Sequence, residues 1–153
     1  MIPQQVELVG GRRVVPTINR EQWLTNFAVL LRPWFRARGF EIPLRIRLGV
    51  GALSTNRRVL GVCHTKLDRD GFRHITISPF FDDPILVGAV LVHELIHAVL
   101  PEHENHGQAF AAAAQKLGLL RPVTQVVPSP ELRAHLQEVV RQIGPYPHRA
   151  LCP

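Results

Sequence analysis

The stretch that decides the fold is AVLVHELIHAVL, which runs from Ala89 to Leu100 and places two histidines and a glutamate inside a hydrophobic run. In an α-helix His93 and His97 lie one turn apart on the same face, so both imidazoles can bind one metal ion. Glu94 follows the first histidine and can reach a metal-bound water molecule without being a ligand. This H-E-x-x-H spacing is typical of zinc hydrolases.

The alternative is that these polar residues are ordinary core residues without a ligand. Residues 85–100 are almost all apolar, which predicts a helix buried on most sides. Polar groups in such a helix are costly unless they are paired or ligated. A metal ion satisfies both imidazoles at once, and the ligand type favours Zn²⁺. We therefore favour the metal site.

The composition fits one globular domain. A chain of 153 residues with 46% hydrophobic residues can bury a core without disulfides. The two cysteines, Cys63 and Cys152, form no C-x-x-C pair, so we expect no zinc ribbon or finger. The sequence contains neither a membrane-spanning apolar run nor a signal peptide, and we expect a cytoplasmic protein with no membrane partner.

The positive charge is concentrated in the N-terminal half. Residues 1–73 carry 13 basic and 5 acidic side chains, whereas residues 74–153 carry 5 and 7. Most of the basic residues are arginines, which suit the bidentate recognition of phosphate. This half is either a DNA-binding surface or an ordinary solvated face, and charge alone leaves both open. The candidate nucleic-acid contacts are Arg45, Arg47, Arg57 and Arg58.

One helix and three strands are expected before the metal-binding helix. Asn19 is a helix N-cap, and apolar residues recur at helical spacing from there to Gly39. Alternating or β-rich segments at 44–50, 59–65 and 72–78 predict a three-stranded antiparallel sheet. The third strand is then free to pair with an extended substrate.

Helices dominate the C-terminal half. Asp83 and Pro84 begin the metal-binding helix, which Pro101 ends. Further helices are expected over 108–117 and 131–143, followed by a loose tail. The expected fold is α+β and zincin-like, with an N-terminal helix, an antiparallel sheet, a buried metal-binding helix and C-terminal helices.

Two histidines compete for the place of the third metal ligand. His103 falls at the metzincin spacing H-E-x-x-H-x-x-G-x-x-H, but Leu100 replaces its glycine. The only methionine is Met1, so the Met-turn of that class is absent. A glutamate ligand from the next helix is also excluded, because residues 108–117 contain no acidic side chain. His106 is the other candidate.

A family resemblance favours His106. The motif His93-Glu94-Leu95-Ile96-His97 is followed by His106-Gly107-Gln108-Ala109-Phe110 and Leu117-Gly118-Leu119, and preceded by Leu60-Gly61-Val62-Cys63 and Ile75-Thr76-Ile77-Ser78. This order resembles the SprT-like zinc metallopeptidases over roughly residues 20–120, without their C-terminal zinc ribbon. The resemblance implies that His93, His97 and His106 bind Zn²⁺ and that Glu94 is the catalytic acid/base.

The resemblance also divides the chain into an extended lead (1–18), a SprT-like metallopeptidase domain (19–121), and a C-terminal helix and tail (122–153) packed on that domain. It implies a metalloprotease that cuts proteins or peptides, including proteins associated with nucleic acid. The alternatives are a non-catalytic, zinc-stabilised nucleic-acid-binding protein and a narrow protease that cuts one repressor.

Three further residues are candidates for substrate contact or for support of the metal ligands. They are His103, His74 and Tyr146. Each carries a polar group that can donate a hydrogen bond to a developing oxyanion.

Overall fold

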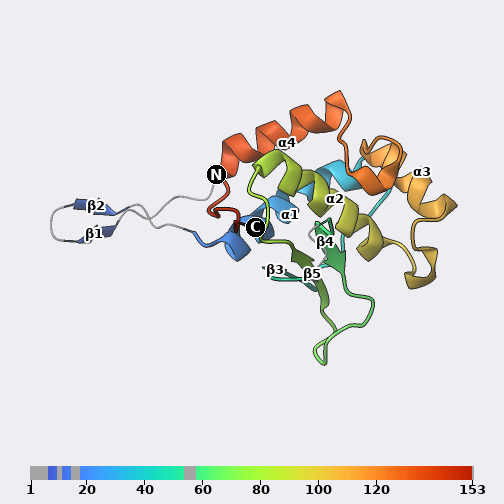
Figure 1. The fold of residues 1–153 in the computed structure, drawn as a ribbon, viewed down its shortest axis with the longest axis horizontal. Helices are drawn as coiled ribbons and strands as arrows, with labels where there is room; N and C mark the ends of the chain where they lie inside the picture. The colour runs from blue at the N-terminus through green and yellow to red at the C-terminus, as the bar shows by residue number, and fades with distance from the viewer. Residues whose placement is uncertain (1–6, 10–11, 15–17, 54–57, 153) are drawn as a thin grey trace.

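The computed structural model describes residues 7–9, 12–14, 18–53 and 58–152. They form an α+β fold with two small sheets and four α-helices (Figure 1). The strands are β1 (Glu7–Val9), β2 (Arg12–Val14), β3 (Ile46–Val50), β4 (Gly61–Cys63) and β5 (Arg73–Ile77). The helices are α1 (Arg20–Arg36), α2 (Pro84–Val99), α3 (Gln108–Leu117) and α4 (Pro130–Ile143), with 3₁₀ turns η1 (Glu102–Glu104) and η2 (Val123–Gln125).

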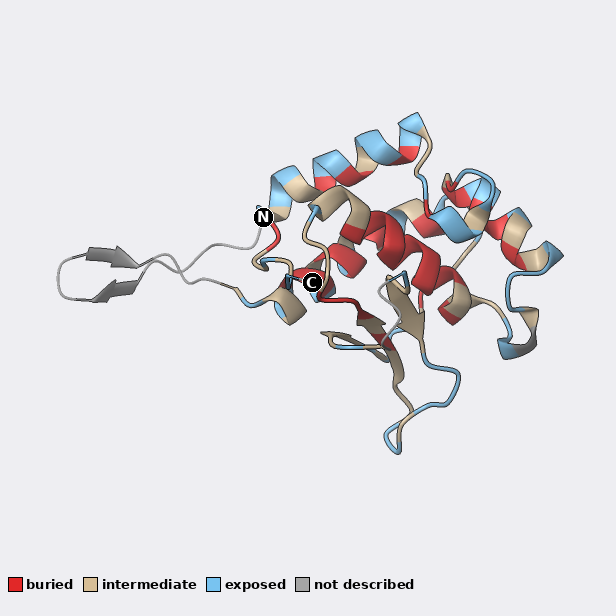
Figure 2. Ribbon diagram, in the orientation of Figure 1, coloured by how far each residue is buried: buried red, intermediate tan, exposed pale blue. Residues whose placement is uncertain are grey.

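Helix α2 forms the centre of the fold. Its N-cap is Asp83, whose side chain accepts hydrogen bonds from the backbone amides of Ile85 and Leu86 at 2.8 and 3.1 Å. Every residue from Val87 to Ile96 is buried, as the almost continuous red ribbon of α2 shows (Figure 2). Within the described residues, no helix combines the length and the apolar character needed to cross a membrane.

Helices α1 and α4 pack against α2. The predicted cap of α1 is confirmed: the Asn19 side chain accepts from the Gln22 amide, and the Gln22 side chain accepts from the Asn19 amide. The buried residues of α1 are Trp23, Leu24, Phe27, Ala28, Leu31 and Phe35, which recur at helical spacing. On α2, Gly88 faces α1 and α4, because a β-carbon placed there would lie 2.6 Å from Phe27 Cζ and 3.2 Å from Leu136 Cδ2.

The sheet beside α2 is mixed, so the prediction of a three-stranded antiparallel sheet is wrong. Its order is β3-β5-β4, with β3 parallel and β4 antiparallel to β5. The physical reason is burial: Ile75 and Ile77 of β5 are fully buried and occupy the central strand, whereas no residue of β3 or β4 is. Strands that follow one another in sequence therefore need not pair.

The tail that follows α4 is packed against the rest of the protein rather than loose. Tyr146 is only 7% exposed, and its ring centroid lies 4.7 Å from that of Trp23. The Trp23 indole donates a hydrogen bond to the Gly144 carbonyl at 2.9 Å. His148 Nε2 lies 2.9 Å from the Pro79 carbonyl oxygen. Aromatic packing and these backbone contacts hold the tail against the start of α2.

Because of the close approach at Gly88, we expect Gly88→Ala to destabilise the protein, although helix propensity alone predicts that it is stabilising. Propensity alone makes Gly88→Ala stabilising by about 1 kcal/mol. A β-carbon 2.6 Å from the buried Phe27 ring calls for the upper part of the usual overpacking cost, about 2–3 kcal/mol, so we expect a net loss of about 1–2 kcal/mol in the free energy of unfolding, measured with urea. Gly49→Ala is the control, because nothing lies within 4 Å of its added β-carbon. A Gly88→Ala protein as stable as the wild type would contradict this packing.

Candidate metal centre

Three imidazoles meet at the C-terminal end of α2. His93 and His97 lie one turn apart on α2, and His106 comes from the turn before α3. The Nε2 atom of His106 lies 3.1 Å from Nε2 of His93 and 3.1 Å from Nε2 of His97. Nitrogens bound tetrahedrally to a zinc ion at 2.0–2.1 Å are about 3.3 Å apart. The separations around His106 are therefore close to those of a ligand set.

The chemistry of the three rings suits a cation. A neutral imidazole nitrogen carries either a proton or a lone pair, so three facing Nε2 atoms cannot all pair with one another. Burial, and then the neighbouring imidazoles, lower the pKa of His93 to about 4. Burial and then His106 lower the pKa of His97 to about 4. These two rings are thus neutral near pH 7 and ready to ligate, and the cluster could hold a metal ion.

Phe110 fixes the three rings in place. This residue of α3 is fully buried. Its ring centroid lies 4.9, 4.5 and 4.9 Å from those of His93, His97 and His106. Side chains held by such packing lose little further freedom when they bind a ligand. The phenylalanine of the H-G-x-x-F motif thus supports the whole cluster.

Glu94 lies against strand β4, next to the imidazoles. Burial raises the pKa of its carboxyl group to about 7, and the backbone amide of Cys63 opposes part of that rise. A β-carbon at Gly61 would lie 3.2 Å from Glu94 Oε1, 3.1 Å from Glu94 Cγ and 2.9 Å from Val90 Cγ1. The absence of a side chain at Gly61 therefore makes room for the glutamate. From the sequence, Gly61 belonged only to segment 60–63 of the family resemblance and had no role of its own.

A cavity of about 250 Å³ brings these groups together. It is lined by Gly61–Thr65 and Arg73 on the sheet side and by His93, Glu94, His97, Glu102, Asn105 and His106 on the helix side. His93 is buried, His97 half-buried and His106 exposed, so the cluster opens to solvent on one side. A substrate can approach the three nitrogens and the carboxylate from that side.

Arg73 is a cavity residue that sequence reasoning missed. Its Nη1 donates to the carbonyl oxygens of His64, at 3.0 Å, and of Thr65, and lies 3.3 Å from Glu102 Oε1. It thus ties the loop after β4 to η1 across the cavity. Strand alternation could have found it, because Arg73 lies on the same face of β5 as the buried Ile75.

Two of the three further candidates, His74 and Tyr146, do not join the cavity. His74 Nε2 lies 2.8 Å from Asp68 Oδ2 in the hairpin between β4 and β5, and His74 does not line the cavity. Tyr146 is buried against Trp23 instead. The side chain of His103 lies outside the described part of the structure. Neither His74 nor Tyr146 is therefore placed to contact a substrate at the metal centre.

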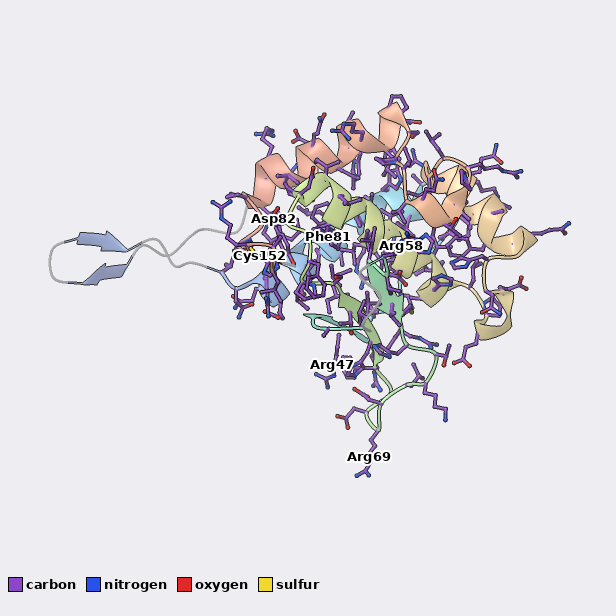
Figure 3. The ribbon with its side chains drawn as sticks, viewed as in Figure 1. Arg47, Arg58, Arg69, Phe81, Asp82 and Cys152 are labelled. Atoms are coloured by element: carbon purple, nitrogen blue, oxygen red, sulfur yellow. The ribbon has the colours of Figure 1, made fainter. Side chains whose placement is uncertain are left out.

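The candidate nucleic-acid contacts are mainly engaged within the protein. Arg45 donates to the Asp70 carbonyl at 3.0 Å, and Arg47 pairs with Asp68 at 3.1 Å and stacks on Phe72. Figure 3 shows Arg47 and Arg69 at the hairpin end of the molecule. Arg58 is exposed shortly before β4, and Arg57 lies outside the described residues. Arg45 and Arg47 thus stabilise a hairpin.

Comparison with known proteins adds no assignment. No protein-family model matches the chain, and no match was found among curated proteins or solved structures. The metal centre is therefore argued from its own geometry.

The geometry predicts that His106 is a ligand, and the ligand set implied by the family resemblance does not include His103. We expect His106→Ala to bind Zn²⁺ or Co²⁺ at least 10-fold more weakly, because about a third of the ligand set is lost. His103→Ala is the matched control and should bind as the wild type does. Metal titration with a competing chromophoric chelator measures both. Full metal loading of His106→Ala together with loss in His103→Ala would reverse the assignment.

Proposed function

We propose that the protein is a zinc-dependent peptide hydrolase of zincin-like fold, related to the SprT-like metallopeptidases. The observation that carries this proposal is the buried carboxyl group of Glu94 in the same cavity as the three converging imidazoles. A metal site that serves stability alone does not require such a carboxylate, which is costly to bury. A hydrolase does require a base beside the metal.

Each residue of the site has its own role in the proposed reaction. His93, His97 and His106 would hold the zinc ion at the wall of the cavity, where the cluster opens to solvent on one side. When bound in such a site, zinc lowers the pKa of water toward neutrality and polarises a carbonyl group. Glu94 accepts a proton on its carboxylate from the attacking water and passes it to the amine of the leaving fragment. Its pKa of about 7 before metal binding suits both transfers.

The substrate backbone binds beside β4 in this proposal. Strand β5 is central and already paired on both sides, so it cannot accept a further strand as the sequence suggested. On either side of β4, Leu60 accepts a hydrogen bond from the Ser78 amide and His64 donates one to the His74 carbonyl, so the polar groups of Gly61 and Cys63 face the opposite edge. The Cys63 amide there is engaged by Glu94, which leaves the Gly61 amide and the two carbonyl groups for a substrate backbone. Because backbone groups dominate such pairing, the recognition is tolerant of sequence.

The other functions expected from the sequence have less support. A non-catalytic nucleic-acid-binding protein requires free arginines, yet Arg45 and Arg47 are paired within the protein. It also leaves the buried Glu94 without a role. Binding of DNA and the cutting of a single repressor remain predictions, and a protease assay on denatured protein with and without single-stranded DNA addresses the first.

Substitution of the proposed base separates catalysis from metal binding. We expect Glu94→Gln to retain Zn²⁺ and to lose about 10²–10⁴-fold in kcat, because general acid–base transfer is removed. Zinc content and cleavage of a denatured protein are measured on the same preparation, with a chelator-treated sample as blank. Glu131→Gln, on the exposed surface of α4, is the control. Undiminished cleavage by Glu94→Gln would exclude this mechanism.

Substitution of Gly61 tests how Glu94 is positioned. An alanine β-carbon at this site contacts both Val90 and Glu94, so we expect the carboxylate to shift and kcat to fall about 10-fold while Zn²⁺ stays bound. Thermal melts verify that the variant is folded at the assay temperature. Gly49→Ala adds the same methyl group on β3 in open space and serves as control. Equal kcat values for Gly61→Ala and wild type would show that β4 does not position the base.

A further inference from the structure

His106 also lines a second hollow, of about 520 Å³, outside the metal cavity. Its other lining residues are Ala111 of α3 and the segment Arg121, Pro122, Val123 and Thr124 that leads into η2. Because His106 belongs to both linings, the second hollow adjoins the proposed metal ion. A substrate chain that crosses the metal centre can therefore place a side chain in this hollow.

The lining of the second hollow combines apolar surface with one arginine. Ala111, Pro122 and Val123 offer small apolar surfaces, which suit the aliphatic part of a side chain. Arg121 is the one arginine or lysine among the described residues that line the hollow, and no acidic residue of the described chain lines it. A carboxylate that entered it would meet positive charge without a competing anion.

The guanidinium of Arg121 is available for a ligand. Arg121 is exposed, and neither an ion pair nor a hydrogen bond links its side chain to another described residue. Arg36 and Arg141, by contrast, are paired with Glu41 at 2.8 Å and with Glu138. The exposed residues Arg69, Arg133 and Arg149 have no such partner within the described chain, but they line neither hollow. An arginine that stands unpaired beside a hollow is suited to bidentate recognition of a carboxylate.

We propose that this hollow is a substrate subsite for a residue that carries a carboxylate on a short apolar stem, with Arg121 as its specificity-determining residue. The carboxylate comes either from a glutamate or aspartate side chain within the peptide or from the free C-terminus of the substrate. The inference rests on the proposed peptide hydrolase function, since it assigns a substrate class to the same site. Binding rather than cleavage tests it most directly.

The experiment measures peptide binding to the zinc-loaded full chain with Glu94→Gln, which removes cleavage. The probes are fluorescent ten-residue peptides with an amidated C-terminus, in which one glutamate is moved along the sequence, each matched to a glutamine peptide. A third set carries glutamine and a free C-terminal carboxylate. Fluorescence anisotropy gives Kd for each, in the Glu94→Gln background and after addition of Arg121→Gln or Arg149→Gln. Arg149 is exposed in the tail, beside Ala150, whose amide binds Asp82 at the far end of α2.

We expect a carboxylate to lower Kd about fivefold at one or two adjacent positions, the size of a charge-assisted contact at an open site. Arg121→Gln should abolish this preference and Arg149→Gln should retain it. Preference for the internal glutamate identifies a side-chain subsite, and preference for the free terminus identifies a carboxypeptidase-like subsite. Equal Kd values for all peptides, no measurable binding, or equal losses in the two arginine variants would overturn the proposal.

Cleavage by the wild-type protein keeps this test separate from that of the proposed function. Selective binding without cleavage of any peptide would leave the subsite in place and refute the hydrolase. Cleavage without any preference for a carboxylate would support the hydrolase and refute the subsite.

Discussion

The structure depends on the burial of an imidazole and a carboxyl group in its most apolar helix. His93 and Glu94 are 6% and 5% exposed on α2, whose other buried residues form the centre of the core. Such groups destabilise a core unless other groups satisfy them. His97 and His106 gather around His93, and the amide of Cys63 lies against Glu94. The same buried residues thus belong both to the core of the fold and to the candidate site.

Two glycines allow the rest of the protein to approach this helix. Gly88 lets the Phe27 ring of α1 lie directly on the backbone of α2, and Gly61 lets β4 approach Glu94 on another side. A β-carbon at either position would come within 3 Å of a buried side chain. The close contact at Gly88 anchors the helix, while the contact at Gly61 sets the position of a reactive carboxyl group. The packing at Gly88 and the placement of Glu94 beside Gly61 therefore both require a residue without a side chain.

The sequence predicted those features that depend on local chemistry. The caps at Asn19 and Asp83, the extent of α2, and the spacing of His93 and His97 all follow from residues within a few positions of each other. Strand order did not, because alternation marks a strand but carries no information on its partner. The tail at Tyr146 was missed for a related reason: proline and glycine indicate irregular backbone, which can still be packed tightly against Trp23.

Arginines that look equivalent in the sequence have different partners in the folded protein. Arg47 neutralises Asp68, Arg73 joins two rims of the metal cavity, and Arg121 has no partner among the described residues. Charge counting cannot distinguish these roles, since each depends on a carboxylate or carbonyl brought near by the fold.

In the proposed function, the position of His106 connects metal binding with substrate selection. His93 and His97 are held by a buried helix, whereas His106 is exposed on a turn, directly after Asn105, whose φ of 32° is unfavourable for a non-glycine residue. The Phe110 ring restrains the ring of His106, but the backbone of His106 lies outside any helix. Because the same side chain lines both hollows, a substrate residue that enters the second hollow contacts a metal ligand directly. Under the proposed function, occupancy of that hollow and the geometry of the metal would then be coupled through one imidazole, so selectivity would act on the metal centre itself.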